Sequence, residues 1–485
     1  MPVLETNEMS GETVQLQEKA NGGAKEPYVV GDEEGNVVIK DNKTINEFDR
    51  SSNLPESIFN LVNSIIGGGI IGLSYSFRVA GLPMGLILLA FCGVITDFAM
   101  ILLLKCGALA DKYTYQGMVE AAFGRNGLYA ISFAQFIYPL AVMMAYGVAI
   151  SDNIPKVFTR TIGPGTILSN RQFINGMATL LIILPLSLPR NIAILDKFSA
   201  LSIVCVFFYS LVILIRAGTL APLTIPSEDA WDFARGGMPQ AFGVMAFAFA
   251  CMHNIYPMYR ALKNTSVKRY SKVVHSSIAV SSLFYIAVAL AGYITFTNMS
   301  QGNLLNNYCP DDDLANGARF IFAFTIILTY PIQVFIAREV IEVGFFKDRP
   351  KSVIRHVAIT FGLIGVATAV SMATDCLGLV IEIAGCFSAS PLAFIFPPLC
   401  YMKLKNKGYL RRKNIKLWLL AIFGVAVMIL GTTMAIVTQA GNCAFTETQR
   451  YWCQGNGLKT VNMSSNGNLT TTALPLNATR SMSFV

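Results

Sequence analysis

Three consecutive glycines, Gly67 to Gly69, lie in the middle of an apolar run that starts near Leu54 and ends near Phe77. Each glycine costs an α-helix about 1 kcal/mol relative to alanine, so this run favours an unwound segment, which we expect to extend from Asn63 to Gly69. Main-chain amides and carbonyls freed in such a segment could bind a zwitterion and a cation, because non-helical backbone survives in a membrane where it lines a cavity. The alternative is a continuous helix whose small residues pack closely against a neighbour.

A second interruption lies in the apolar run from Gly236 to Met258, where the polar residues His253 and Asn254 precede Pro257. Proline cannot donate a helical hydrogen bond, so a continuous helix is unfavourable here. The helix could break and resume, or it could simply end near His253. The lone His253 is most simply a structural residue, and its alternative role is part of a proton path.

The composition indicates which class of protein must hold these breaks. Of 485 residues, 53% are hydrophobic and only 14% are charged, and the mean hydropathy is +0.52. Soluble domains carry about 25% charged residues. The net charge is +8, but the basic residues lie in separate loops rather than in one patch, which argues against a nucleic-acid partner. We therefore expect an all-α membrane protein that is surrounded by a lipid bilayer.

Eleven apolar runs are long enough to cross a bilayer, which takes about 20 residues per helix. The fourth run is short and contains Pro185. If spans one to five and six to ten form two sets, the second set enters the membrane from the opposite side, because five is odd. Both breaks then lie in the first helix of their set, as in transporters with inverted repeats and a central site. The approximate bounds of the runs are Leu54–Phe77, Leu82–Leu104, Gly127–Ile150, Phe173–Leu188, Phe198–Ile215, Gly236–Met258, Ser276–Phe296, Ala318–Ile336, Val353–Met372, Cys376–Tyr401 and Leu417–Val437.

Loop charge predicts the orientation of the chain. The loops after spans six, eight and ten are rich in Lys and Arg, whereas those after spans seven and nine carry almost none, so the N-terminus should be cytoplasmic. An odd number of spans places the C-terminus outside, where glycosylation sequons at Asn298, Asn462, Asn468 and Asn477 can be used. The predicted organisation is a disordered cytoplasmic tail (1–50), a transporter domain (51–437, repeats about 54–216 and 236–402, extra helix 417–437) and an extracytoplasmic glycosylated tail (438–485).

Cysteines and acidic residues in unusual places give further expectations. Cys443 and Cys453 lie in the polar C-terminal tail and are predicted to form a disulfide, with Cys309 as a rival partner for either. Asp97 and Glu382 lie within apolar spans, where a charged side chain costs about 2.5–3.5 kcal/mol, so both should face the interior. Both could be structural hydrogen-bonding groups. Glu382 could instead be part of a proton pathway.

The sequence contains no nucleophile motif and no phosphate-binding loop, and its three histidines are widely separated. We therefore expect no enzymatic activity, no organic cofactor and no metal site other than one for a coupling ion.

The run Phe59-Asn60-Leu-Val-Asn63-Ser64-Ile-Ile-Gly67-Gly68-Gly69-Ile-Ile-Gly72-Leu-Ser-Tyr75 resembles the first helix of the amino acid/auxin permease-like transporters. Within them it is most similar to the sodium-coupled neutral amino acid transporter family. The resemblance extends from about Ser51 to Val437. It implies a LeuT-like 5+5 inverted repeat with one extra helix, a neutral amino acid as substrate and sodium as the coupling ion.

The resemblance also implies which residues bind the sodium ion and the amino acid substrate. The family's sodium ligands match the side chain of Asn63, the backbone carbonyl of Ile66 and the hydroxyl of Thr329. Its substrate contacts match Ser64, Ile65, Gly67, Gly68 and Gly69 in the first span, and Phe247 and Phe249 in the sixth. Members with an interhelical disulfide place it between spans five and six, but that loop has no cysteine here, so this comparison does not decide the pairing.

The sequence fits either sodium or protons as the driving ion. Moving one charge down 100 mV yields about 2.3 kcal/mol, and a tenfold gradient yields about 1.4 kcal/mol, so sodium or protons could drive uptake. The fifth span, Phe198 to Ile215, has no charged residue, which favours sodium, because proton-coupled relatives can carry a lysine there. Proton antiport through His253 or Glu382 could accompany sodium symport.

The rivals to a sodium-driven transporter are a proton-driven transporter and a transport-dead sensor. Both the plasma membrane and an endolysosomal membrane fit the sequence.

Overall fold

The computed structural model describes residues 52–189, 193–224, 226–346, 350, 352–405, 414–439 and 451–453, and the strands given below. The chain divides into two units, Met1–Arg50 and Ser51–Val485.

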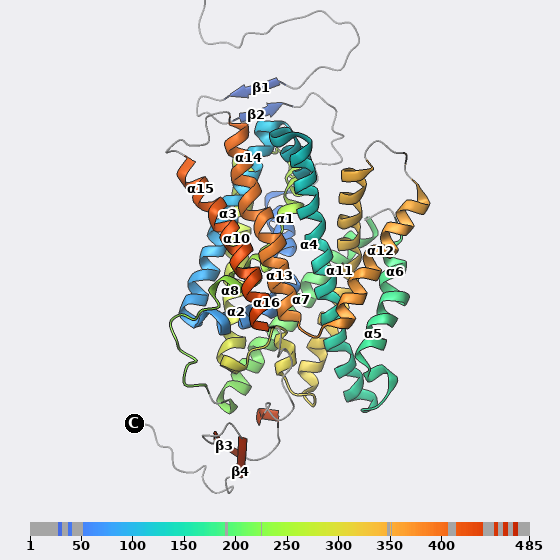
Figure 1. Cartoon of the computed structure of the whole chain (residues 1–485), viewed down its shortest axis with the longest axis vertical. Helices are drawn as coiled ribbons and strands as arrows, with labels where there is room; N and C mark the ends of the chain where they lie inside the picture. Colours follow the sequence, from blue (N-terminus) through green and yellow to red (C-terminus); the bar gives the residue numbers. More distant parts are fainter. Residues whose placement is uncertain are drawn as a thin grey trace, which may run out of the picture. The chain divides into compact units, whose positions relative to one another are not determined.

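The larger unit is a bundle of long helices (Figure 1). π-helical segments at Thr179–Ile183, Ala384–Ala389, Pro391–Ile395 and Val427–Gly431 continue several of them. The α-helices are α1 (Leu54–Ile65), α2 (Leu73–Ala80), α3 (Leu82–Ala110), α4 (Tyr115–Ile162), α5 (Arg171–Ala178), α6 (Leu184–Ser187), α7 (Ala193–Leu220), α8 (Met238–Ala248), α9 (Ile255–Ala261), α10 (Val267–Phe296), α11 (Asp313–Phe345), α12 (Val353–Ala373), α13 (Leu377–Ile383), α14 (Phe396–Leu404), α15 (Ile415–Ala426) and α16 (Thr432–Gln439).

Nine helices of the described part are long and apolar enough to cross a membrane, and the bent pair formed by α1 and Gly68–Ala80 is a tenth candidate. The fourth predicted span is present as the helical run from α5 through α6, which is shorter than the 18 residues required of a span. The all-α membrane class is thus confirmed. The count of eleven spans stays a prediction.

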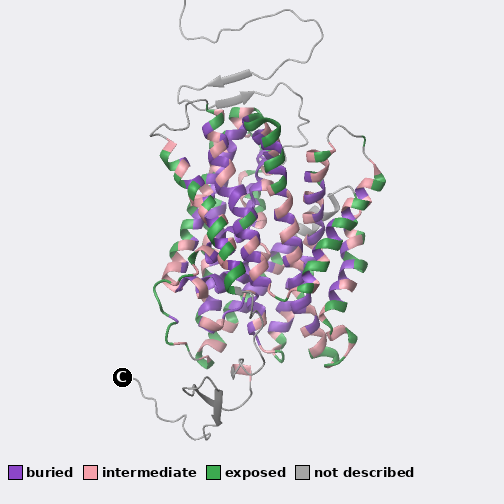
Figure 2. Cartoon of the chain, viewed as in Figure 1, coloured by how far each residue is buried: buried purple, intermediate pink, exposed green. Residues whose placement is uncertain are grey.

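Large apolar side chains cover the outside of this bundle. Val94, Leu181, Val204 and Leu283 are between 63% and 70% exposed. Figure 2 shows exposed residues on the outer helix faces and buried residues between the helices. A soluble monomer rarely exposes so much contiguous apolar surface, so this surface is suited to lipid.

The two ends of the bundle can be told apart by their contacts. At one end, the start of α1 meets the end of α9, where Ser52 donates a backbone hydrogen bond to Ala261. We call this the α1 end. At the other end, Arg160 near the end of α4 forms a 2.8 Å ion pair with Asp313 at the start of α11. We call this the disulfide end, because the disulfide lies beside the start of α11.

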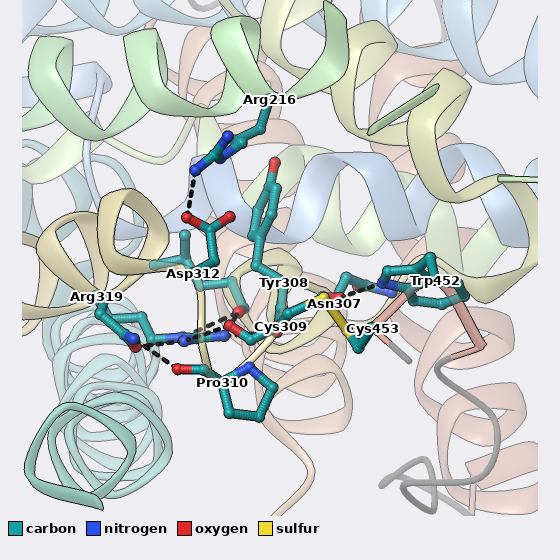
Figure 3. Close-up of a disulfide and its surroundings, with 11 residues drawn as sticks. Arg216, Asn307, Tyr308, Cys309, Pro310, Asp312, Arg319, Trp452 and Cys453 are labelled. Atoms are coloured by element: carbon teal, nitrogen blue, oxygen red, sulfur yellow. Dashed lines mark hydrogen bonds and ion pairs between the residues drawn. A yellow bond between two sulfur atoms is a disulfide. The ribbon is translucent and has the colours of Figure 1, made fainter. Parts of the chain in front are cut away.

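That disulfide joins Cys309, in the loop between α10 and α11, to Cys453 (Figure 3). The predicted pairing of Cys443 with Cys453 is therefore wrong, and Cys443 lies outside the described residues. Trp452 explains the difference, because its indole N–H donates to the Asn307 carbonyl (3.1 Å) and brings Cys453 to the loop. Spacing along the chain cannot reveal that approach. Cys376 is also disulfide-bonded.

A buried arginine holds the same loop on the bundle. Arg319 of α11 is fully buried and donates to the backbone carbonyls of Leu305, Tyr308 and Cys309. Charge-assisted hydrogen bonds of this kind offset the cost of burying the cation. The loop is therefore fixed by polar contacts beside the disulfide (Figure 3).

Two short hairpins were not anticipated from the sequence. In the smaller unit, β1 (Tyr28–Gly31) pairs antiparallel with β2 (Val37–Lys40), and the β-branched residues of these strands favour that pairing. The other residues of the predicted disordered tail lie outside the described part. Near the C-terminus, β3 (Lys459–Met463) pairs with β4 (Leu469–Ala473). The side chains of the predicted glycosylation sites Asn462, Asn468 and Asn477 lie outside the described part.

The remaining predicted glycosylation site, Asn298, lies between α10 and α11 and is partly buried. Its side-chain oxygen accepts a 2.5 Å hydrogen bond from Arg235, and its amide donates to Asp229. A glycan at this amide would have to replace the contact with Asp229, so the sequon is not freely presented in this fold.

Candidate functional site

The first break is real but shorter than predicted. Asn63 to Ile65 complete α1, and Ile66 (φ −77°, ψ 101°) and Gly67 (φ −141°, ψ −153°) are extended. A 3₁₀ turn over Gly68–Gly72 then leads into α2, and the two halves are bent by 46°. The prediction of an unwound glycine segment is confirmed, because two extended residues interrupt the helix inside an apolar run.

The second break is also confirmed. α8 ends at Ala248, a 3₁₀ turn covers Met252–Asn254, and α9 starts at Ile255. Pro257 lies in the first turn of α9, where a missing backbone N–H costs nothing. The helix therefore resumes after the break, and the reading in which it simply ends near His253 is wrong.

The two breaks are in direct contact. A Cβ atom on Gly69 would lie only 2.9 Å from the Cα of Ala248, so the backbones approach too closely for a side chain. The side-chain amide of Asn254 donates to the hydroxyl of Ser64 at 2.8 Å. The segments on either side of both breaks thus form one structural unit.

Tyrosines supply hydrogen bonds to the carbonyls that the breaks release. The hydroxyl of Tyr285, on α10, lies 2.7 Å from the carbonyl oxygen of Ile65 and 2.8 Å from that of Ala248. These are the last helical residues before the two breaks, whose carbonyls have no helical partner. Tyr138 of α4 donates to the carbonyl of Ala250 at 3.1 Å. Sequence reasoning missed both tyrosines, because aromatic residues in apolar spans look like ordinary core.

The breaks open onto a cavity of about 780 Å³, a volume suited to a small molecule. It reaches the α1 end, where Glu120, Arg260 and Glu339 line it. Most of the predicted ligands lie on its wall, namely Asn63, Ser64, Ile65, Ile66, Gly67, Gly68, Gly69, Phe247, His253 and Thr329. The cavity therefore brings together both predicted ligand sets and one candidate of the proton path.

Two predicted site residues do not reach this cavity. Phe249 packs edge-on against Tyr285, with ring centroids 5.1 Å apart. Glu382 of α13 is fully buried and interacts with Tyr75 of α2 and Gln240 of α8. It faces the interior, as expected, but lies between the halves that adjoin the breaks rather than on the cavity wall.

Asp97, the other acid in an apolar span, pairs with His275 of α10 at 2.9 Å. The Asp97 side chain is 19% exposed and the His275 side chain is 59% exposed, so this pair lies near the surface of the bundle rather than in its centre. Neither residue is among those that line the cavity.

Thr329 of α11 lines the same cavity as the residues of the first break. Its hydroxyl donates to the backbone carbonyls of Thr325 (3.0 Å) and Ile326 (3.2 Å), so its oxygen can still accept or coordinate on the other side. Tyr146 of α4 interacts with Thr329 and with Gln333, both of which line the cavity. Sequence reasoning missed Tyr146 and Gln333. The available signal was a lone amide four residues after Thr329 in an apolar run.

A polar cluster lies at the disulfide end, away from the cavity. The buried Asp152 of α4 accepts hydrogen bonds from Asn303 (3.2 Å) and Asn306 (3.1 Å) and forms a 3.1 Å ion pair with Arg171. None of these four residues lines the cavity. The cavity thus opens toward the α1 end, where the exposed Arg260 lines it, and it does not extend to this cluster.

The family model described as transmembrane amino acid transporter protein matches residues 50–437, a range that contains both breaks and the described residues of the cavity. The chain belongs to this family. As a member of the transmembrane amino acid transporters, it carries a transport function rather than an enzymatic one.

This transporter is similar to curated relatives along most of its length. It is 44% identical over 386 residues to the Danio rerio protein named "Putative sodium-coupled neutral amino acid transporter 11", a match that covers 79% of this chain and 86% of the relative. The Bos taurus protein of the same name is 41% identical, covering 87% and 91%. Vacuolar amino acid transporter 2 of Saccharomyces cerevisiae is 30% identical, covering 82% and 86%. The family resemblance seen in the first-span motif is confirmed.

Solved structures agree on the fold. A crystal structure of the Eremococcus coleocola manganese transporter superposes with a TM-score of 0.51 at 12% sequence identity, covering 86% of this chain and 92% of that chain. At this identity the likeness shows that the amino acid transporter has a fold found among membrane transporters, and nothing about its substrate.

Proposed function

We propose that this transporter is a secondary active carrier of neutral L-amino acids that is driven by sodium and alternates access around its two broken helices. The observation that carries the proposal is the meeting of both breaks at one cavity whose wall includes Asn63, Ile66 and Thr329. Main-chain groups from Ile65 to Gly69 would hold the charged amino and carboxylate groups of the substrate, because broken helices offer amides and carbonyls at that point.

The oxygen atoms around the first break support sodium as the coupling ion. Sodium is a hard cation that prefers oxygen ligands, as do the better-characterised hard cations of proteins. The amide oxygen of Asn63, the carbonyl of Ile66 and the hydroxyl of Thr329 are such ligands. Because the Thr329 proton is directed to its own helix, the hydroxyl can present its oxygen to a cation.

The proposal includes eleven spans, a 5+5 inverted repeat and an inward-facing state. The loop charges predict a cytoplasmic α1 end, toward which the cavity opens. The disulfide at the opposite end supports an extracytoplasmic C-terminus, because disulfides persist in oxidising compartments. Either the plasma membrane or an endolysosomal membrane provides that arrangement.

Uptake of radiolabelled neutral amino acids into proteoliposomes tests the proposal, with sodium and pH gradients varied independently. We expect Asn63→Ala and Thr329→Ala to raise the half-saturating sodium concentration at least about tenfold, the loss expected from one ligand to a charge. Thr329→Ser, which keeps the hydroxyl, is the matched control. Sodium activation that is unchanged in both alanine variants would defeat the assignment.

A proton-coupled amino acid transporter is the second candidate, and the buried Glu382 favours it. Its carboxyl contacts Tyr75 and Gln240, which belong to the helices adjoining the two breaks. A proton carried there could act in place of sodium or move in antiport with it. Uptake that persists without sodium and collapses with a protonophore would show that protons act in place of sodium. Antiport would instead appear as sodium-dependent uptake whose pH dependence disappears in Glu382→Gln.

A further inference from the structure

One buried oxygen on the cavity wall has no explanation in the ligand set above. The side-chain oxygen Oε1 of Gln333 is buried, and no hydrogen-bond donor reaches it from any described residue. At least about 90% of buried polar groups in folded proteins have a partner, and an exception calls for a missing water or ion. Gln333 lines the cavity, so that partner can come from the cavity itself.

The position of Gln333 relates this oxygen to the first break. Gln333 follows Thr329 by four residues on α11, so the two side chains share a helix face with Cβ atoms about 5–6 Å apart. The same spacing lets a helix present two ligands to one metal ion. Tyr146 links the pair to the break, because it interacts with both side chains and a Cβ on Gly68 would lie 3.1 Å from its ring.

The direction of α11 gives the oxygen a place along the cavity. The helix runs from the disulfide end at Asp313 to the α1 end at Phe345, so Gln333 lies closer than Thr329 to the open end. A coupling ion must leave its site as well as bind there, so its ligands must be neither too few nor too strong. A neutral amide oxygen suits that requirement better than a carboxylate.

We propose that Gln333 supplies a further oxygen ligand to the coupling cation, between Thr329 and the open end of the cavity, so that the ion passes this amide as it enters or leaves. The assignment rests on the proposed sodium-driven function. It adds a ligand and a direction of exit along α11 to the three ligands that the family resemblance implies.

The test uses the full-length transporter in proteoliposomes and separates sodium activation from substrate affinity. We expect Gln333→Leu to raise the half-saturating sodium concentration about tenfold. The substrate KM at saturating sodium should stay within about twofold. Gln333→Glu keeps an oxygen and removes the amide donor, so its half-saturating sodium concentration should be no higher than the native value, because a carboxylate oxygen binds a hard cation at least as strongly as an amide oxygen. Gln172→Leu, at an exposed glutamine that does not line the cavity, is the control and should leave sodium activation unchanged.

The outcomes distinguish failure of the Gln333 assignment from failure of the proposed sodium-driven function. If Asn63→Ala weakens sodium activation and Gln333→Leu does not, the Gln333 assignment is overturned and the sodium site stands. If Gln333→Glu raises the half-saturating sodium concentration as much as Gln333→Leu does, the oxygen of this side chain is not what matters. The assignment then fails as well. If neither Asn63→Ala nor Gln333→Leu changes sodium activation, sodium coupling itself fails. Should Gln333→Leu not fold by size-exclusion chromatography, Gln333→Glu and Gln333→Met are compared instead, and equal sodium activation in these two overturns the assignment.

Discussion

Asn254 donates its side-chain amide to the hydroxyl of Ser64 at 2.8 Å, and thereby joins the two broken helices by a direct bond between side chains. Both residues also line the cavity. A movement that separates the halves must therefore change the wall on which the substrate would bind. Four pairs of variants test the contacts that stabilise the site and the disulfide end.

Tyr285→Phe removes the hydroxyl whose one proton is shared between the carbonyls of Ile65 and Ala248, while keeping the ring against Phe249. Leaving buried carbonyls unsatisfied costs about 1–3 kcal/mol, so we expect lower thermal stability in detergent and weaker uptake. Tyr293→Phe is the control, because Tyr293 is on the same helix and donates to Ala230, away from the breaks. It should lose comparable stability and keep its sodium and substrate half-saturation values. Equal transport defects in the two variants would contradict a role for Tyr285 at the breaks.

Gly69→Ala places a methyl group 2.9 Å from the Cα of Ala248, where no flexible side chain can move aside. We expect the breaks to be forced apart, with loss of most uptake and a destabilisation of about 1–3 kcal/mol. At Gly67 an added Cβ meets no atom within 4 Å, so Gly67→Ala should fold normally and change only substrate affinity. Thermal unfolding and uptake, measured for both variants, check this prediction. A similar loss of stability in Gly67→Ala and Gly69→Ala would contradict it.

Asp152→Ala removes the acceptor for Asn303 and Asn306 and the partner of Arg171 at the disulfide end. We expect a destabilisation of about 1–3 kcal/mol and greater access of water-soluble thiol reagents to a cysteine introduced at Ser151. Asp313→Ala breaks an ion pair at the same end whose acid is 77% exposed, and should have little effect because exposed pairs contribute little. Unchanged labelling in Asp152→Ala would show that this cluster does not close the disulfide end.

Mass spectrometry of unreduced peptides should recover a crosslink between Cys309 and Cys453. Cys309→Ser and Cys453→Ser should lower the unfolding temperature by the same amount, and the double variant should lower it no further, because each change breaks one bond. A disulfide typically contributes about 2–4 kcal/mol. Detection of a Cys443–Cys453 crosslink in the native protein would contradict the pairing in the structure.

The breaks could be predicted from the sequence because their causes are local. Glycines from Gly67 to Gly69 and the proline at Pro257 disfavour a helix whatever surrounds them. The extent of the first break could not be predicted. Asn63 to Ile65 stay helical because nothing in their own sequence opposes a helix, and the Ile65 carbonyl is satisfied by Tyr285 from a distant span.

The parts of the site that escaped prediction depend on contacts between distant segments. Tyr146 and Gln333 meet at the cavity wall because α4 approaches α11, an approach that no local pattern encodes. Phe249 was expected at the substrate because the family's contacts in the sixth span match Phe247 and Phe249. The break after Ala248 reorients the backbone, and Phe249 turns to Tyr285 instead.

The link between Cys309 and Cys453 has a practical side for anyone preparing this protein. A purification buffer with a strong thiol reductant would release the residues around Trp452 from the loop that Arg319 holds, and it would also break the disulfide of Cys376 directly before α13. A preparation made with such a reductant and one made without it are therefore two different samples, and binding constants from the two should not be pooled.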